Sequence, residues 1–197
     1  MKTRIILPDT EGISEAGAIL RDGGLVAFPT ETVYGLGANA LDAVATKHIY
    51  EAKGRPSDNP MIVHVASIDM LNGVASDVTD EQKAIMSKLW PGPITFVLRK
   101  NPNVPDVTTG GLDTVAVRWP ARREATEIIE AAGVPIAAPS ANLSGKPSPT
   151  IFEDVAEDMD GRIDAIVKGE RTAIGIESTV LDLTSEIPTI LRPGFIT

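Results

Sequence analysis

Short runs of apolar residues alternate with helix-like segments along most of this sequence, and the alternation restricts the fold more than any other feature. The runs are rich in Val, Ile, Leu and Ala and are bounded by Gly or Pro, which is typical of buried strands. We predict strands at residues 24–29, 61–66, 95–99, 114–118, 134–138, 165–167, 178–183 and 189–191. Helices between such strands predict an α/β protein whose sheet is covered by helices, with antiparallel pairs near the C-terminus.

Five helices are expected in the intervening segments. Apolar spacing and capping residues place them at residues 14–21, 42–53, 79–90, 122–132 and 150–158. Thr79 with Gln82, and Thr150 with Glu153, match the capping box, in which two residues satisfy each other's backbone N–H groups. Gly133 directly follows the fourth helix, at a position where a left-handed glycine commonly ends a helix.

Length, charge and cysteine content narrow the classes of protein that remain. A chain of 197 residues suits one packed domain, so residues 1–197 are expected to form a single domain. The absence of cysteine excludes disulfide scaffolds, thiolate metal sites and iron–sulfur clusters. The net charge of −9 argues against sequence-independent coating of nucleic acid, which requires a broadly basic surface. Because no targeting segment or membrane span is evident in the sequence, we expect a cytoplasmic protein without membrane contact.

Two glycine-containing segments imitate nucleotide-binding motifs. Residues 144–147 (Ser-Gly-Lys-Pro) are similar to the end of a phosphate-binding loop, but Pro147 cannot donate the N–H that such a loop needs. Residues 35–40 (Gly-Leu-Gly-Ala-Asn-Ala) imitate a dinucleotide fingerprint, although that motif should begin directly at a strand end. The alternative is that residues 35–40 form a glycine turn into the helix at 42–53.

The chain has two histidines, so a metal site built from histidine is not expected. His48 falls in the middle of a predicted helix and is expected to be structural. His64 lies within an apolar strand, where a hydrogen-bonded core histidine is the simplest interpretation and a functional histidine is the alternative. Neighbouring acids such as Asp158 and Asp160 are expected on a solvated helix face.

Polar residues gather at the ends of the predicted strands and in the adjoining loops. Ligands of α/β sheets bind beyond the carboxyl ends of strands, so several of these loops could share one cleft. The loops contain hydroxyl groups and five cations on Gly- or Pro-stiffened segments: Lys53, Arg55, Arg118, Lys146 and Arg192. Guanidinium groups match phosphate and carboxylate geometry. A basic cleft in an acidic protein suggests a small anionic ligand, such as a nucleotide or another phosphorylated compound.

Eight segments of the sequence, in this order, carry a family resemblance. They are PTETVYGLG at 29–37, KGRP at 53–56, NPMIVHV at 59–65, LWPGPIT at 89–95, VAVR at 115–118, PSANLSG at 139–145, ESTV at 177–180 and LRPG at 191–194. With these segments the chain resembles the YrdC-like domain of threonylcarbamoyl-AMP synthases. The resemblance implies a single YrdC-like domain over residues 1–197, with a twisted open mixed sheet flanked by helices and a concave basic cleft.

The resemblance also implies an enzyme, a nucleotidyltransferase that condenses L-threonine, bicarbonate or CO2 and ATP to threonylcarbamoyl-AMP and pyrophosphate. Matched residue by residue, the L-threonine site would contain Thr32, His64, Arg118, the backbone at Ala138, and Ser178. The ATP site would contain Arg55, Asn59, Thr114, Ser140, Asn142, Ser148 and Arg192. Lys53 and Arg55 would be the catalytic cations that stabilise charge on the phosphates.

The implied cofactor is Mg²⁺ carried with ATP, with no protein cage for the metal and no organic cofactor. The implied partners are proteins that transfer the threonylcarbamoyl group to tRNA, together with an RNA contact that includes double-stranded RNA. Two other classes stay open at this point. One is an RNA-binding module with this fold that does not make the adenylate, and the other is a dinucleotide-dependent oxidoreductase built on residues 35–40.

Overall fold

The computed structural model describes residues 2–56 and 59–197. Ser57 and Asp58, which belong to the predicted loop at 53–60, lie outside the described residues, as does Met1. The strands are β1 (Arg4–Ile6), β2 (Val26–Pro29), β3 (Tyr34–Asn39), β4 (Ile62–His64), β5 (Ile94–Arg99), β6 (Thr114–Arg118), β7 (Ile136–Ala137), β8 (Ala165–Val167), β9 (Thr179–Asp182) and β10 (Thr189–Arg192). The helices are α1 (Thr10–Arg21), α2 (Ala43–Lys53), α3 (Ile68–Val74), α4 (Asp80–Leu89), α5 (Asp106–Thr109), α6 (Arg123–Ala132) and α7 (Phe152–Met159).

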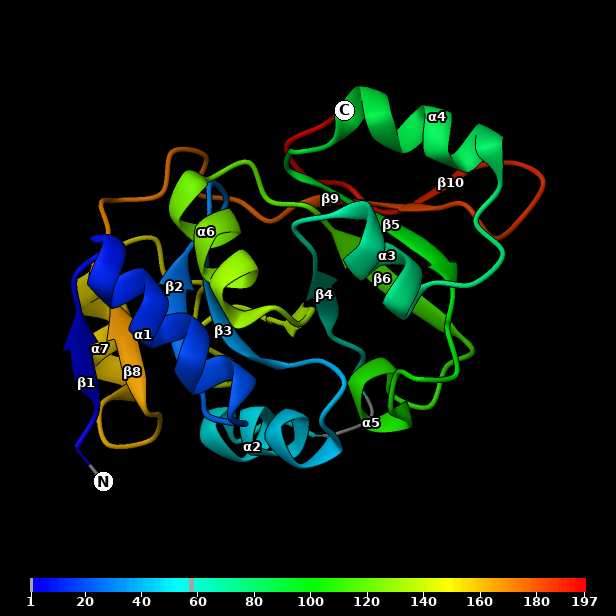
Figure 1. Ribbon diagram of the computed structural model, residues 1–197. Coiled ribbons are helices and arrows are strands. Elements are labelled where there is room, and N and C mark those ends of the chain that lie inside the picture. Colours follow the sequence, from blue (N-terminus) through cyan, green and yellow to red (C-terminus); the bar gives the residue numbers. More distant parts are fainter. Residues whose placement is uncertain (1, 57–58) are drawn as a thin grey trace.

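The described strands form one open mixed sheet in the order β1-β8-β2-β3-β7-β4-β6-β5-β9-β10 (Figure 1). Four neighbouring pairs are parallel, namely β1 with β8, β8 with β2, β4 with β6, and β5 with β9. The other pairs are antiparallel, including β9 with β10 near the C-terminus, as the sequence predicts. The open mixed α/β sheet flanked by helices is therefore confirmed.

Alternate residues of the central strands enter two separate parts of the core, as the two-residue period of a strand requires. In β2, Val26 and Phe28 pack in the same cluster as residues of α1 and α6. Ala27 belongs to the other cluster, which contains Val155 of α7. Figure 1 shows α1 and α6 side by side on one face of the sheet, with α7 behind β8. Both faces of this half of the sheet are therefore covered by helices.

The helix ends agree with the predicted capping in part. Thr79 and Gln82 form the predicted capping box at the start of α4, and Gly133 ends α6 with a left-handed φ of 69°. The capping box predicted for Thr150 and Glu153 is wrong. The N-cap of α7 is Ile151, which makes no side-chain cap hydrogen bond, because the chain continues in extended conformation one residue further before it turns.

Residues 35–40 form neither a dinucleotide fingerprint nor a turn, and both interpretations are wrong. They belong largely to β3, which lies antiparallel to β2 and β7 in the middle of the sheet. Glycine suits this strand because a Cβ on Gly37 would lie 2.7 Å from Cε1 of Phe28. Segment 35–40 therefore contains no strand-to-helix turn that could cradle a pyrophosphate.

The centre of the sheet positions the site. β7 has two residues, and the chain that follows stays hydrogen-bonded to its neighbours β3 and β4 through Pro139 and Ala138, up to an isolated bridge between Ser140 and Gly35. The parallel strands β4 and β6 end side by side, with His64 opposite Arg118 in the register. The loop after β7 and the ends of β4 and β6 thus meet at one edge of the sheet. Among the described residues, no helix is long and apolar enough to cross a membrane.

Candidate active site

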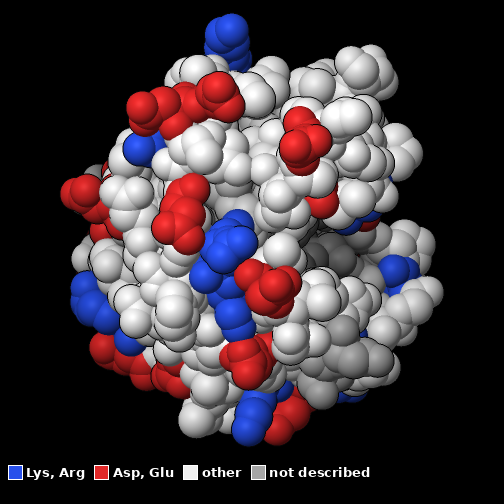
Figure 2. All heavy atoms as spheres, turned by 90° about the vertical axis from the view of Figure 1, so that its right-hand side faces the viewer, with Lys and Arg blue, Asp and Glu red and all other residues white. Residues whose placement is uncertain are grey.

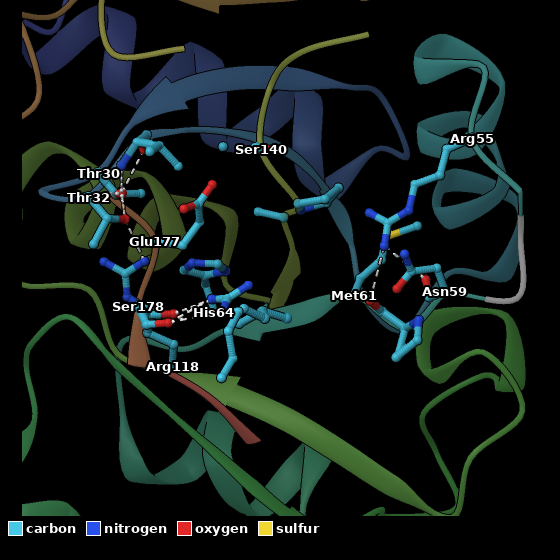
Figure 3. A pocket seen from close by; sticks show the side chains of 17 residues that line it. Thr30, Thr32, Arg55, Asn59, Met61, His64, Arg118, Ser140, Glu177 and Ser178 are labelled. Carbon is cyan, nitrogen blue, oxygen red and sulfur yellow. Dashed lines mark hydrogen bonds between the residues drawn. The ribbon is translucent and has the colours of Figure 1, made fainter. Parts of the chain in front are cut away.

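A cavity of about 260 Å³ lies beside the carboxyl ends of β4 and β6 (Figure 3). Six parts of the fold contribute to its walls: the turn between β2 and β3, the segment between α2 and β4, the ends of β4 and β6, the loop after β7, the segment before β9, and the end of β10. The loops at the carboxyl ends of strands therefore share one hollow, as the sequence predicts.

Most of the predicted site residues line this cavity, although they are far apart in the sequence. They are Thr32, Arg55, Asn59, His64, Arg118, Ala138, Ser140, Ser178 and Arg192. Four other predicted residues do not line it, namely Lys53, Thr114, Asn142 and Ser148.

Arg118 is buried at the base of the cavity, with 4% of its surface exposed. Its Nη2 lies 2.6 Å from Oε1 of Glu31, and its Nη1 donates a hydrogen bond of 2.9 Å to Oγ1 of Thr32. Nε donates to the carbonyl of Gly92 at 3.3 Å. Burial lowers the pKa of Arg118, and the pairing with Glu31 opposes that shift. The guanidinium is thus held in one orientation by three contacts from two segments of the chain.

His64 contributes a neutral imidazole to the same wall. It is buried, and its Nδ1 has no hydrogen-bond partner among the described residues. Burial, reinforced by the charge of Arg118, lowers the pKa of His64 to about 3. A neutral imidazole offers one donor and one acceptor, so His64 can serve a polar ligand but carries no charge near neutral pH. The other histidine, His48, is exposed on α2.

Ser178 is fixed from two sides. Its hydroxyl lies 2.8 Å from that of Thr95 on β5, which is fully buried. Arg192, at the end of β10, donates through Nη2 to the carbonyl of Ser178 at 2.7 Å and to its Oγ at 3.2 Å. Burial lowers the pKa of Arg192, opposed by the charge of Glu177. The segment before β9 is therefore attached to both neighbouring strands.

Arg55 lies across the cavity from Arg118, as Figure 3 shows. Its guanidinium carbon lies 5.9 Å from the ring centre of Tyr50, and its Nη2 donates to the carbonyls of Asn59 and Pro60 at 3.3 and 3.4 Å. The hydroxyl of Tyr50 donates to the carbonyl of Asn59 at 3.0 Å. Arg55 and the residues that precede β4 are therefore held together as one wall of the cavity.

Lys53 and Asn142 lie behind the cavity wall rather than in it. Nζ of Lys53 donates to the carbonyl of Ser140 and, at 2.6 Å, to that of Asn142. Burial, with the nearby charge of Arg55, lowers the pKa of Lys53 to about 8. The amide of Asn142 donates to the carbonyls of Leu143 and Lys146. Both residues thus shape the loop that carries Ser140.

The two remaining predicted residues lie to the sides. Ser148 donates a hydrogen bond of 2.6 Å to Oε1 of Glu177, which does line the cavity, and so reaches the site through that carboxylate. The bond from Ser148 lowers the pKa of Glu177. Thr114, at the start of β6, lines a different hollow together with Arg99 and Lys100. The structure therefore does not bring Thr114 to the cavity.

Sequence reasoning missed the acidic residues of the site. Glu31 pairs with Arg118, and the carboxylate of Glu177 points into the cavity (Figure 3). Each directly precedes a predicted site residue in the sequence, Glu31 before Thr32 and Glu177 before Ser178, and this position was the one indication that they belong to the site. Asp158 was expected on a solvated helix face, and this is wrong because it is 7% exposed. It binds Lys146, and so Lys146 is not one of the cations that line the cavity.

Charge in and around the cavity is mixed. Three guanidinium groups line it together with the carboxylate of Glu177, and Glu31 lies directly behind Arg118. On the face shown in Figure 2, Lys and Arg side chains lie among Asp and Glu rather than in one continuous basic area. Three guanidinium groups that face one hollow, without a continuous basic area on the face in Figure 2, suit a small anion better than a long polyanion.

A protein-bound metal cage has no counterpart in the described residues. Among residues 2–56 and 59–197, no group of three or more His, Asp or Glu side chains is placed to hold a metal ion. Among the described residues, the cavity offers arginines, hydroxyl groups and the carboxylate of Glu177. This set fits a Mg²⁺ ion that arrives on the phosphates of a nucleotide, because Mg²⁺ keeps water and phosphate oxygens as ligands in such sites.

Fold and cavity together define a class of protein: an open mixed α/β sheet whose strand ends present arginine and hydroxyl side chains around one hollow. A family model for the Sua5, YciO and YrdC proteins, described as "Telomere recombination", matches residues 18–194. The chain therefore belongs to the Sua5/YciO/YrdC family.

Curated relatives are similar along nearly all of this chain but are longer. The chain is 58% identical over 179 residues to the threonylcarbamoyl-AMP synthase of Pyrococcus abyssi, which covers 91% of this chain and 53% of that protein. It is 56% identical over 187 residues to the protein of the same name from Bacillus subtilis, with 94% and 54% covered. The chain thus spans about half the length of these curated relatives.

Solved structures match the fold closely. P. abyssi Sua5 complexed with L-threonine superposes with a TM-score of 0.94 at 54% identity, covering 98% of this chain and 58% of that one. E. coli YciO superposes with a TM-score of 0.86 at 26% identity, covering 98% and 96%. The YrdC-like sheet implied by the resemblance is therefore confirmed.

Proposed function

We propose that the protein synthesises L-threonylcarbamoyladenylate from L-threonine, bicarbonate or CO2, and ATP, with release of pyrophosphate. The observation that carries the proposal is the convergence of Arg55, Arg118, Ser140 and Arg192 on one cavity. Two further findings support it. The two relatives described above are named threonylcarbamoyl-AMP synthase, and a solved relative is complexed with L-threonine.

In this proposal the wall around Arg118 binds the amino acid. The Arg118 guanidinium pairs with the substrate carboxylate, since planar donors match a carboxylate in a bidentate manner. Thr32 and Ser178 hold the remaining polar groups, with the backbone at Ala138 closing the side. His64 supplies a neutral polar contact through the free Nδ1. A neutral group is suitable here because the substrate amine must be uncharged to react.

The opposite wall binds the nucleotide. Arg55, Asn59 and Ser140 line this part of the cavity and would contact ATP. Arg192 would reach ATP from the side of Ser178, and Lys53 and Asn142 support the loop that carries Ser140. Thr114 and Ser148, which the resemblance assigns to ATP, stay proposals: Ser148 reaches the cavity through Glu177, and Thr114 lies at the neighbouring hollow.

The reaction needs no covalent enzyme intermediate. The substrate nitrogen forms a bond to the carbon of CO2 and releases a proton to give a carbamate. With bicarbonate the same carbamate forms, and the amine proton leaves with the hydroxyl group as water. A carbamate oxygen then attacks the α-phosphorus, and the bond to the bridging β-phosphate oxygen breaks, so that its electron pair leaves with pyrophosphate. Arg55 and its neighbours supply alignment and charge neutralisation. Mg²⁺ bound to the phosphates would supply further charge neutralisation.

The partners follow from the product. Threonylcarbamoyl-AMP is an activated acyl donor, so proteins that transfer the group to tRNA would consume it, and we propose the cytoplasm as the compartment. An RNA contact, including double-stranded RNA, stays a proposal. The mixed charges in Figure 2 and the net charge of −9 favour a small-molecule enzyme over an RNA-binding module.

The experiment measures pyrophosphate release from ATP with L-threonine and bicarbonate, and traps the adenylate for mass spectrometry. We expect release to require both co-substrates and to fall when serine replaces threonine. Arg123→Ala is a suitable control variant, because Arg123 is an exposed arginine that pairs with Glu127 on α6, outside the cavity. ATP turnover without L-threonine, or salt-dependent tRNA binding with no turnover, would reject the proposed synthesis.

A further inference from the structure

The loop after β7, residues 139–149, is attached to the fold by two buried charged side chains that approach it from different helices. Lys53, the last residue of α2, binds the carbonyls of Ser140 and Asn142. Asp158, in the last turn of α7, binds the loop a few residues further on. Backbone hydrogen bonds with Tyr34 and Leu36 of β3 hold the two ends of this loop, at Pro139, Ala141 and Pro149, so the charged side chains act mainly on the part between those ends.

Asp158 makes the more specific of the two attachments. Its Oδ2 accepts a hydrogen bond of 3.0 Å from the backbone N–H of Leu143, and its Oδ1 lies 2.5 Å from Nζ of Lys146. Its side chain is 7% exposed. Although burial opposes it, the hydrogen bonds from Lys146 and Leu143 keep the pKa of Asp158 below its usual value. The group is therefore an ionised carboxylate that stabilises one turn of this loop.

Both ends of the attached turn reach the cavity. On one side Ser140 lines it directly. On the other side Ser148 donates to Glu177, whose carboxylate also lines it. Asp158 itself does not line the cavity. The turn at Leu143 lies between these two contacts, so a shift of the turn would strain both of them against the backbone hydrogen bonds that hold Ala141 and Pro149 to Tyr34.

We propose that Asp158 is a positioning residue for the nucleotide half of the site: it fixes the turn at Leu143 so that Ser140 meets the phosphates of ATP and Ser148 keeps its hydrogen bond to Glu177. This inference rests on the proposed function. The amino-acid half is fixed by other contacts, namely Glu31 on Arg118 and Thr95 on Ser178. Loss of Asp158 should therefore weaken ATP use and leave L-threonine use almost unchanged.

The test compares Asp158→Ala with Glu157→Gln. Glu157 is the matched control because it contacts the same lysine at 3.4 Å but is 76% exposed and does not bind the loop backbone. We expect Asp158→Ala to raise the KM for ATP on the order of tenfold, since small misplacements of site groups have large effects. The KM for L-threonine should stay within about twofold, and Glu157→Gln should match the wild type on both counts.

Amide exchange gives a readout that does not depend on catalysis. The N–H of Leu143 should exchange faster in Asp158→Ala, with little change in β2 or β6. Calorimetry of ATP binding to the wild type distinguishes a failure of the proposed function from a failure of the positioning role of Asp158. If the wild type binds ATP but makes no adenylate, the proposed function fails, while the loss of ATP affinity in Asp158→Ala still tests the positioning role.

Asp158→Asn serves if the alanine variant does not fold. The amide keeps the shape and an acceptor for Leu143 but loses the ion pair with Lys146, so we expect a smaller rise in the KM for ATP in the same direction. Unchanged ATP affinity in either folded variant would overturn the inference. Equal rises in the KM for ATP and for L-threonine would also overturn it, because they would indicate a general structural role.

Discussion

Acid should destabilise the protein through His64, and the structure gives the size of the effect. Burial lowers the pKa of this histidine from 6.5 to about 3. In the unfolded chain the imidazole binds a proton below about 6.5, whereas in the folded chain it stays neutral until about 3. The unfolded state therefore holds more protons in this interval, and the free energy of unfolding falls as the pH falls from about 6.5 towards 3.

The expected loss is about 1.4 kcal/mol for each pH unit, or about 3 kcal/mol over the first two units below 6.5. Urea unfolding at a series of pH values measures it. Paired carboxylates add their own acid sensitivity, so the informative quantity is the difference between the wild type and His64→Gln, which has no imidazole to titrate. His48→Gln controls for the loss of an exposed histidine. If the unfolding free energies of the wild type and of His64→Gln changed with pH in parallel, the reasoning would be refuted.

Three further perturbations test the charges around the cavity. Arg55→Ala should lower the rate of adenylate formation about a hundredfold, or about 3 kcal/mol of transition-state stabilisation; pyrophosphate release at the wild-type rate would contradict the role of Arg55. Glu31→Gln should destabilise the fold by about 3 to 5 kcal/mol, because it leaves Arg118 charged and buried without its anion; a change in unfolding free energy below about 1 kcal/mol would show that the pair is not coupled. Lys53 should titrate near pH 8 when its side chain is followed by NMR. The free energy of unfolding should rise with pH between about 8 and 10.5, because the lysine of the unfolded chain keeps its proton up to the higher pH. Lys53→Met should abolish that rise.

Much of the sheet could be predicted because its strands are short, apolar and clearly bounded. The strand at Thr114–Arg118 and the strand at Ala165–Val167 have the predicted limits. β3 was missed because Gly35 and Gly37 weaken the pattern of a strand. Gly37 is required because Phe28 occupies the space beside it, which is a tertiary reason that local propensity does not reveal. β1 and α5 were missed because three or four residues carry too little periodicity.

The residues of the site, like the strands, could be predicted from the sequence only in part. Its arginines and hydroxyl groups could be found because they stand in loops beside strand ends. The direction in which a side chain points could not be predicted from the sequence. Lys53 is expected at the phosphates, but its side chain binds the carbonyls of Ser140 and Asn142 behind the cavity wall. A buried acid looks like a surface acid in a sequence, which concealed Glu31 and Asp158. Their burial depends on cations that come from distant segments, Arg118 for Glu31 and Lys146 for Asp158.

The cavity takes its walls from segments that run from Thr30 to Arg192 and from both halves of the sheet. A molecule seated there joins segments beside β2 and β10, which lie far apart in the strand order, and adds to the contacts that Arg118 already makes with Glu31 and Thr32. Any partial opening that separates these strands also empties the cavity. A ligand therefore binds the cavity only when both halves of the sheet are folded. A tightly bound ligand should slow amide exchange in all strands of the sheet and not only in those beside the cavity.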